Sequence, residues 1–201
     1  AMSDNPIMIV TGGSRGIGSA IARLAGERGY DVCVNYTASA DRAEAVAEDI
    51  RAHGQRALAV QADVSKPEDI ERLFAETDAG LGKVDVLVNN AAISIEVAVA
   101  DVEVDTIRSQ IDTNLLGPML TTRQAIQRMA TSRGGKGGVV VNISSISALY
   151  GGLPTDVVYA GTKGGLDAFT IGIAKEVAPD GIRVCGIRPG LIRTEMWDNT
   201  V

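Results

Sequence analysis

Six short apolar runs, separated by longer stretches with helical spacing, set the pattern of this 201-residue chain. The first run is Ile7–Val10, and apolar residues then recur every three or four positions from Ile17 to Ala25, as on one face of a helix. The other runs predict strands at Asp31–Tyr36, 57–62, 84–88, 139–143 and 183–187. Strands that alternate with helices need crossover connections, which make the strands parallel.

Further helices are expected at 39–52, 103–128 and Val157–Val177, and one begins near Ser65. Ser65 would be the N-cap of that helix, with Pro67 in the first turn and Glu68 at the capping-box position. Apolar strands without alternation need cover on both faces. We therefore predict an α/β fold, a Rossmann-type doubly wound parallel sheet in a three-layer α/β/α sandwich, as one domain over residues 1–201.

Charge and composition exclude several classes of protein. The net charge of −6 disfavours nucleic acid as the main partner, because phosphate binding needs a basic surface. No apolar run approaches the roughly 18 residues that span a bilayer, and residues 1–6 do not resemble a secretion signal, so we expect a cytoplasmic protein. Cys33 and Cys185 lie in apolar runs and are expected to be reduced core residues. No cluster has metal-ligand spacing, so no metal is expected.

A glycine-rich turn, TGGSRGIG at residues 11–18, joins the first strand to the first helix. Glycine lets the backbone turn tightly and lets a diphosphate approach, and the helix N-terminus offers unpaired N–H groups. No Gly-Lys-Ser/Thr follows, so the turn is not a nucleotide-hydrolase loop. The turn predicts a dinucleotide site built by Gly12, Ser14, Arg15, Gly16, Ile17 and Gly18.

This glycine spacing, with Thr11 in front, resembles the short-chain dehydrogenase/reductase family, specifically its single-domain branch. Further motifs follow in the family's order over nearly the whole chain. The resemblance implies that Asp63 and Val64 lie at the adenine ring. It also implies cofactor contacts by an Asn-Asn-Ala-Gly-like motif in which Ala92 replaces glycine, and by a segment that holds the nicotinamide carboxamide. These residues are Asn90, Ala91, Ala92, Pro189, Gly190, Ile192 and Thr194.

The end of the second strand bears on the choice of dinucleotide. It reads Asn35, Tyr36, Thr37 and lacks the acid that bonds the ribose hydroxyls in NAD-selective sites. An acid there would repel a 2′-phosphate. We therefore favour NADP(H), with NAD as the alternative. Arg15 would pair with the 2′-phosphate, and Asn35 and Thr37 would donate hydrogen bonds.

Tyr159 and Lys163 lie four residues apart and share one face of a predicted helix. At about 6 Å and an effective dielectric near 20, the Coulomb energy between phenolate and ammonium is about 2.8 kcal/mol, or about two pKa units. We therefore expect the pKa of Tyr159 to fall from about 10 towards 8, which suits an acid and base near neutrality. The resemblance implies this role, and implies that Lys163 also binds the nicotinamide ribose.

Two more positions complete the catalytic set that the resemblance implies. Ser145 would hydrogen-bond the substrate oxygen, and the neighbouring Ser144 is interpreted as a backbone-bonding turn residue. Asn114, within the helix expected at 103–128, would bend that helix and help hold a water that relays protons through Lys163.

These motifs predict an oxidoreductase that transfers hydride between NADP(H) and a carbonyl or secondary alcohol. The alternatives are a catalytically silent dinucleotide sensor and an epimerase or dehydratase of the family's extended branch. A serine hydrolase would need a histidine base, and the single histidine, His53, lies at a helix end.

Substrate and assembly are less constrained. Similar enzymes act on 3-oxoacyl thioesters, including those of acyl-carrier protein, and on sugars such as glucose, steroids and small ketones. They continue past the position of Thr194 with a substrate-covering segment and a last strand, neither of which we expect within residues 1–201. The helices at 103–128 and Val157–Val177 resemble those that build dimers and tetramers, so a homotetramer or homodimer is expected.

Overall fold

A computed structural model describes residues 4–194 of the chain. Its strands form one parallel sheet in the order β3-β2-β1-β4-β5-β6. Their bounds are Ile7–Val10 (β1), Asp31–Tyr36 (β2), Ala57–Gln61 (β3), Val86–Asn89 (β4), Gly138–Ile143 (β5) and Ile182–Ile187 (β6). The strand order reverses between β1 and β4, where ligands bind in such sheets. The predicted doubly wound α/β sandwich is confirmed.

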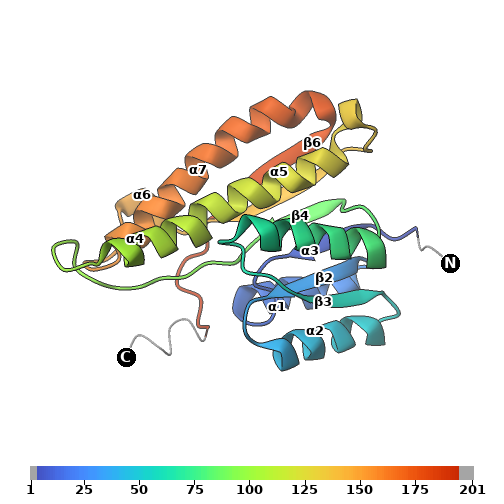
Figure 1. The fold of residues 1–201 in the computed structure, drawn as a ribbon, viewed down its shortest axis with the longest axis horizontal. Coiled ribbons are helices and arrows are strands. Elements are labelled where there is room, and N and C mark those ends of the chain that lie inside the picture. The colour runs from blue at the N-terminus through green and yellow to red at the C-terminus, as the bar shows by residue number, and fades with distance from the viewer. Residues whose placement is uncertain (1–3, 195–201) are drawn as a thin grey trace.

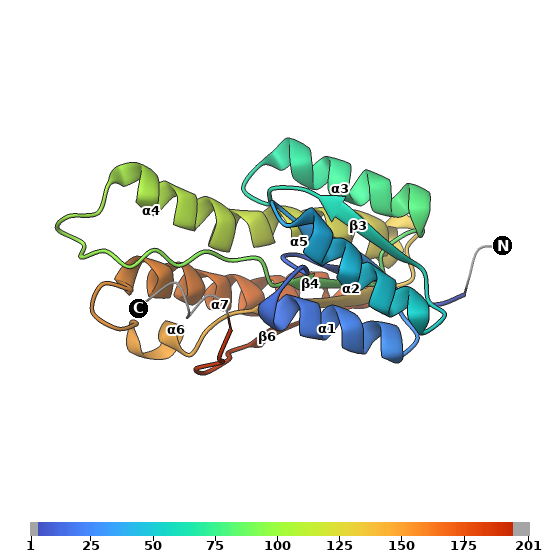
Figure 2. The same ribbon diagram turned by 90° about the horizontal axis from the view of Figure 1, so that it is seen from below.

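Helices cover both faces of the sheet, as Figures 1 and 2 show. One face carries α1 and α2, and the other carries α3, α5 and α7. The α-helices are Gly16–Glu27 (α1), Ala40–Ala52 (α2), Pro67–Gly80 (α3), Val104–Ile111 (α4), Gly117–Met129 (α5), Ser147–Tyr150 (α6) and Val157–Val177 (α7). Shorter helical segments are the π-helix η1 (Asp112–Leu116) and the 3₁₀ turns η2 (Thr131–Arg133) and η3 (Ala178–Asp180).

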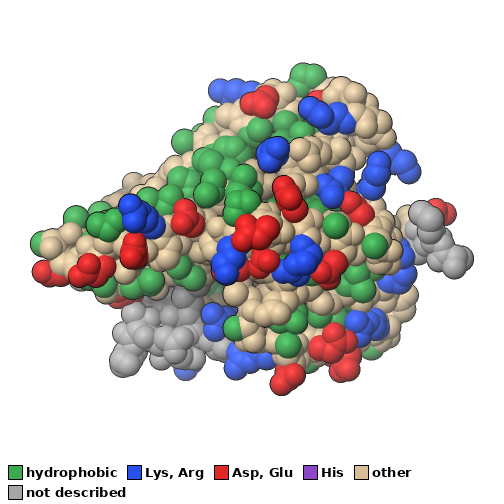
Figure 3. Space-filling model, viewed as in Figure 1, with side chains coloured by type: hydrophobic (Ala, Val, Ile, Leu, Met, Phe, Trp, Pro, Cys, Tyr) green, Lys and Arg blue, Asp and Glu red, His purple; other side chains and the backbone are tan. Residues whose placement is uncertain are grey.

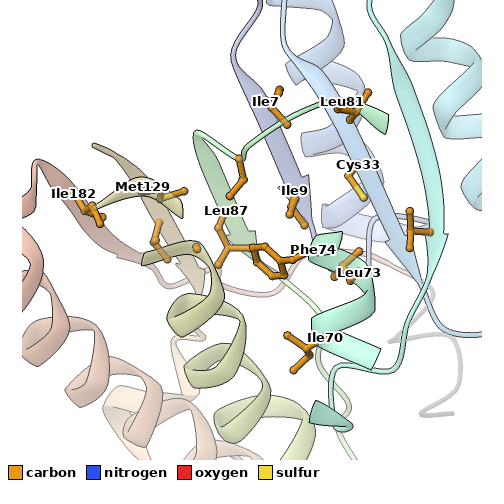
Figure 4. Packing of buried hydrophobic residues seen from close by; sticks show 14 of the residues in the cluster. Ile7, Ile9, Cys33, Ile70, Leu73, Phe74, Leu81, Leu87, Met129 and Ile182 are labelled. Carbon is orange, nitrogen blue, oxygen red and sulfur yellow. The ribbon is translucent and has the colours of Figure 1, made fainter. Parts of the chain in front are cut away.

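Two hydrophobic cores hold these layers together. Figure 4 shows the larger one, in which Phe74 and Leu73 of α3 lie against Ile9 and Leu87 of the sheet. On the other face the side chains are smaller, and Gly26 lets α1 approach α2, since a Cβ there would lie 2.9 Å from Ile50. The two cores pack against opposite faces of the central strands, so the carboxyl ends of β1 and β4 are held at a fixed separation.

The long helix expected at 103–128 is broken by the π-helical turn η1. Asn114 lies in this turn, is fully buried, and hydrogen-bonds the backbone of Ile93. A π-helical turn holds one more residue than an α-helical turn, and this extra residue aligns Asn114 with Ile93. An unbroken α-helix would lose that alignment. The helix then continues as α5, where a Cβ on Gly117 would lie 2.7 Å from the Val64 carbonyl oxygen.

The start of α3 differs from the predicted capping box. Lys66 is the N-cap residue, and the Ser65 hydroxyl donates a hydrogen bond to Asp63 Oδ1 at 2.7 Å. Asp69 reaches back, and its Oδ2 accepts a bond from the Asp63 N–H at 2.8 Å. The prediction that Ser65 caps the helix is wrong because Asp63 already holds that hydroxyl.

The two cysteines have different surroundings. Cys33 is buried, and burial raises the pKa of its thiol to about 12. Cys185 is exposed, so the prediction of a core position is wrong for this residue. Ile182 and Val184 of the same strand pack into the core beneath α7, and alternation turns Cys185 towards the opposite face.

Across the described chain, no helix combines the length and apolar character that crossing a membrane would require.

Candidate functional site

The turn from β1 into α1 forms a backbone cradle. Gly12 and Gly16 adopt φ values of +62° and +55°, which side chains rarely tolerate. A Cβ on Gly18 would lie 2.3 Å from the Gly12 carbonyl oxygen, so only glycine fits there. Arg15 is the N-cap of α1, and within the described residues no side chain caps that first turn. The open N–H groups and the close backbone packing fit a diphosphate.

Asn35 supports this cradle from below. Its Oδ1 accepts a hydrogen bond from the Gly12 N–H at 3.1 Å, and its Nδ2 donates to the Ala62 carbonyl at 2.9 Å. The side chain is 1% exposed. The prediction that Asn35 bonds a 2′-phosphate is therefore wrong, because its polar atoms are committed to the protein backbone. In the sequence, this supporting role could have been recognised from a polar side chain inside an otherwise apolar parallel strand.

Thr11 and Asn90 join the cradle to the end of β4. Thr11 Oγ1 accepts hydrogen bonds from the N–H groups of Asn90 (2.9 Å) and Ala91 (3.1 Å). Asn90 Nδ2 donates to the carbonyls of Thr11 (2.9 Å) and Gly12 (3.1 Å). These bonds hold the point where the strand order reverses, so the Asn90–Ala91–Ala92 motif lies beside the glycine turn.

The other predicted adenosine-side residues are Arg15 in the glycine turn, Tyr36 and Thr37 at the end of β2, and Asp63 and Val64 after β3. Arg15 and Thr37 are exposed, and Tyr36 is half-buried. Asp63 is also half-buried, and its Oδ1 is bonded by Ser65. The Val64 side chain, by contrast, is buried in the protein. Any contact of Val64 with a ligand would therefore involve its backbone.

The segment after β6 extends from the catalytic side of the sheet towards the cradle. Two carbonyls hold it to the loop after β5: that of Ile187 accepts from the Ser144 N–H at 2.7 Å, and that of Pro189 accepts from the Ile146 N–H at 3.0 Å. Further along, Thr194 lies 3.5 Å from the position a Cβ on Gly16 would take. The predicted residues Gly190 and Ile192 are exposed between these points.

Tyr159, Lys163 and Ser145 converge beyond the end of β5. Lys163 is 2% exposed, and its Nζ donates a hydrogen bond to the Ile143 carbonyl at 2.8 Å. The same Nζ lies 5.6 Å from the centre of the Tyr159 ring. Tyr159 is half-buried, and its side chain is hydrogen-bonded by Ser145. The structure thus brings a phenol, an ammonium and a hydroxyl together at one sheet edge.

The pKa values in this cluster differ from the expectation. Burial lowers the pKa of Lys163 to about 8, and the charge of Asp167 opposes that shift. The pKa of Tyr159 is raised, chiefly by burial and further by Asp156, while the hydrogen bond from Ser145 acts in the other direction. The prediction of a lowered pKa for Tyr159 is wrong for this structure. It considered the attraction to Lys163 alone and left out desolvation of the phenolate.

The two serines after β5 have separate surroundings. Ser144 Oγ donates to the Lys163 carbonyl at 3.3 Å, in addition to the backbone bond described above. Ser145 Oγ accepts from the Ser147 N–H at 3.1 Å and interacts with Tyr159. Ser144 therefore fastens the loop to α7, while Ser145 reaches the phenol.

Asn114 links three elements around this cluster. Its Oδ1 accepts from the Ile93 N–H at 2.8 Å, and its Nδ2 donates to the Ile93 carbonyl at 2.8 Å and to Thr162 Oγ1 at 3.2 Å. The side chain thus joins the loop after β4 to α7 one residue from Lys163. Because the amide is committed to these partners, any water near Asn114 would have to be held by its backbone.

The loop after β4 is hydrogen-bonded to the turn before α7, and Asp156 of this turn acts electrostatically on Tyr159. Ser94 Oγ donates to Asp156 Oδ1 at 2.9 Å, and the Val97 N–H donates to the Thr155 carbonyl at 2.9 Å. Thr155 has a φ of 78°, which marks the bend before α7. Burial raises the pKa of Asp156.

Comparison with known proteins adds independent findings. The sequence profile of the short chain dehydrogenase family matches residues 6–201. An uncharacterized oxidoreductase of Escherichia coli, YgfF, is 41% identical over 191 residues, covering 94% of this chain and 77% of the relative. A 3-oxoacyl-[acyl-carrier-protein] reductase of Staphylococcus epidermidis is 38% identical, covering 96% and 77%.

A solved structure is similar over nearly the same extent. It is a short chain dehydrogenase from Burkholderia cenocepacia in complex with NADP. The TM-score is 0.90 at 33% identity, with 97% of this chain and 77% of the other covered.

Proposed function

The chain belongs to the short chain dehydrogenase family and is a nicotinamide-dependent oxidoreductase, and from this premise we propose that Tyr159 is its general acid and base. The reaction would interconvert a carbonyl and a secondary alcohol. The convergence of Tyr159, Ser145 and Lys163 beside the segment that runs to the glycine cradle carries this proposal.

Each group has a distinct task in the proposed reaction. The nicotinamide ring, when bound, supplies or accepts hydride at the substrate carbon. Ser145 polarises the substrate oxygen by a hydrogen bond. Tyr159 gives its proton to that oxygen during reduction, and its raised pKa keeps the phenol protonated near neutrality. The charge of Lys163 stabilises the phenolate that remains, and we assign its ammonium to the nicotinamide ribose as well.

We assign Asn114 an indirect task in the reaction, which it performs by positioning the backbone of η1. Its side chain fixes the loop after β4 against α7, so the π-helical turn keeps its place beside Lys163. The π-helical turn interrupts the regular α-helical ladder, and we assign to a backbone carbonyl of this turn the task of holding a water. We propose that this water returns the proton to Tyr159 through Lys163.

The cofactor proposed is NADP(H). The absence of an acid at the end of β2 and the NADP complex of the Burkholderia relative support it. Exposed Arg15 and Thr37 flank the cradle and are the candidates for a 2′-phosphate. The Arg15→Ala variant should raise the KM for NADPH about tenfold more than the KM for NADH, because a charged hydrogen bond is lost only with NADPH. An unchanged ratio would count against Arg15 as the selective residue.

The substrate is proposed to be a small carbonyl compound or alcohol. Exposed apolar side chains lie near the catalytic cluster in the loop after β4, in and after α6, and after β6. They are Ile95, Leu149, Leu153 and Leu191. The relatives include 3-oxoacyl-[acyl-carrier-protein] reductases, and such an apolar rim would suit an acyl chain.

A homotetramer or homodimer is proposed from the outer face of the helical layer. Figure 3 shows hydrophobic side chains gathered over α5 and α7. Exposed apolar side chains on α4, η1 and α7 are Val104, Ile111, Leu116 and Ile171. A second copy would remove these side chains from water. Analytical ultracentrifugation should then show an oligomer at micromolar concentration.

The decisive experiment follows NADPH oxidation with a panel of ketones and thioesters. Tyr159→Phe should lower kcat by about a thousandfold, because the proton donor is lost, and should leave NADPH binding within about threefold. Tyr30→Phe, at a half-buried tyrosine before β2, is the matched control. Full turnover in Tyr159→Phe would overturn the proposal. Binding of NADPH without turnover of any carbonyl in the unaltered protein would favour a dinucleotide sensor.

A further inference from the structure

An ion pair lies directly behind the catalytic cluster. Arg188 Nε donates a hydrogen bond to Asp167 Oδ2 at 2.7 Å. Asp167 is on α7, one helical turn after Lys163, and its side chain is 13% exposed. Arg188 directly precedes Pro189, at the start of the segment that runs to the cradle. The pair therefore connects the helix of the proposed acid and base to the proposed nicotinamide segment.

The charge of Asp167 acts on Lys163. Burial lowers the pKa of the lysine, and Asp167 is the nearby charge that opposes this effect. The ammonium also donates a hydrogen bond to the Ile143 carbonyl of β5 and lies near the Tyr159 ring of α7. Arg188, after β6, lies beyond Asp167 and is 43% exposed.

The segment after β6 depends on the same carboxylate. The backbone carbonyls of Ile187 and Pro189 accept bonds from the loop after β5, on either side of Arg188. The Arg188 side chain adds the attachment to α7. With these three attachments, the segment leaves the sheet in a single direction, and Thr194 comes to lie beside Gly16.

We propose that Asp167 is a positioning residue with two linked roles. Its carboxylate keeps Lys163 in the ammonium form, and through Arg188 it fixes the segment that carries Pro189 and Gly190. The inference rests on the proposed function, since the ammonium form of Lys163 matters only if that lysine assists Tyr159. Beyond that function, Asp167 is the group that maintains the charge of Lys163.

The test uses Asp167→Asn and Arg188→Gln in the full chain, because the two changes separate the roles. In Asp167→Asn, Lys163 should lose its proton at lower pH, so the alkaline limb of kcat/KM for reduction should move down by about one pH unit. In Arg188→Gln the carboxylate stays, so this limb should not move down. The KM for NADPH should instead rise about fivefold, as the segment loses one attachment.

A readout other than activity makes the outcome decisive. Nuclear magnetic resonance of isotope-labelled lysine in the cofactor-free protein should show Lys163 titrating about one pH unit lower in Asp167→Asn. Asp49→Asn is the matched control, because Asp49 forms a 2.7 Å pair with Arg23 on the distant α1–α2 surface. Its Lys163 titration, KM and thermal midpoint should stay close to those of the unaltered protein.

Two results would overturn the inference: an unchanged titration of Lys163 in Asp167→Asn, or identical pH profiles in Asp167→Asn and Arg188→Gln. Either would leave the pair with a structural role only. Failure of the proposed function would look different. Tyr159→Phe would then retain turnover, while the lysine titration would still decide whether Asp167 maintains the charge.

Discussion

The glycine cradle at β1–α1 and the catalytic cluster at β5–α7 lie at the same edge of the sheet but are stabilised differently. In the cradle, neutral side chains hold the backbone, with Asn35 and Asn90 bonded to the carbonyls and N–H groups of the turn. In the catalytic cluster, a buried ammonium, Lys163, is held against a carbonyl and its pKa is lowered.

A chain of buried neutral side chains also supports the catalytic side. Asn89 Nδ2 donates to Asn142 Oδ1 at 2.9 Å, and Asn142 Nδ2 donates to Thr170 Oγ1 at 2.8 Å. This chain ties β4 and β5 to α7, the helix that carries Tyr159 and Lys163. We therefore expect the cradle to lose cofactor binding when an added atom creates a steric clash, and the catalytic cluster to lose activity when a charge is changed.

The largest loss of cofactor binding is expected at Gly18. In Gly18→Ala the added Cβ would lie 2.3 Å from the Gly12 carbonyl oxygen and 2.5 Å from Asn90 Nδ2, so the cradle must deform. We expect NADPH affinity, measured by fluorescence titration, to fall by about 100-fold or more. Gly172→Ala is the control, because its Cβ meets nothing within 4 Å; it should stabilise α7 by up to about 1 kcal/mol. Retained affinity in Gly18→Ala would remove the steric account.

The next effect compares two of the buried asparagines, Asn35 at the cradle and Asn142 on the catalytic side. Asn35→Ala leaves the Gly12 N–H and the Ala62 carbonyl without their partner, and Asn142→Ala does the same to its neighbours. Each variant should lower the free energy of unfolding by about 3 kcal/mol in urea denaturation. Asn35→Ala alone should also weaken NADPH binding, because only Asn35 touches the cradle. Equal NADPH affinities in the two variants would contradict this division between the cradle and the catalytic side.

The smallest effect is a pH dependence that belongs to the catalytic side. The pKa of Lys163 is about 8 in the folded protein and ordinary in the unfolded chain, so between these values the unfolded chain binds more protons. Stability should therefore rise relative to Lys163→Met by about 1–2 kcal/mol from pH 8 to pH 10, measured by chemical denaturation. A difference that is constant across this range would show that burial does not perturb the lysine.

Several features could be predicted because their causes are local in the chain. The period of apolar residues specified the strands and α7, and the spacing of Gly12, Gly16 and Gly18 indicated the cradle. The helical spacing of Tyr159 and Lys163 placed both on one face of α7. Each of these depends on residues within one or two turns of each other.

The remaining features needed groups that are distant in the sequence. Asn35 became a support for the cradle because the carbonyl of Ala62 and the N–H of Gly12 lie on either side of it. Asn114 sits in a π-turn that bonds the loop after β4, and Cys185 is exposed because of the face it takes in β6. No periodicity encodes the hydrogen-bond partners of Asn35 and Asn114, since these partners are set by which elements are neighbours in the fold.

By itself, the sequence determined the doubly wound sheet, the glycine turn and the pairing of a phenol with an ammonium, because short-range geometry dictates all three. The tertiary structure alone decided the charge state of that pair. Burial raises the pKa of Tyr159 and lowers that of Lys163, and the opposing charge comes from Asp167, which is itself anchored to Arg188 beyond β6. Desolvation depends on everything packed around a group, and no local pattern in the sequence records it.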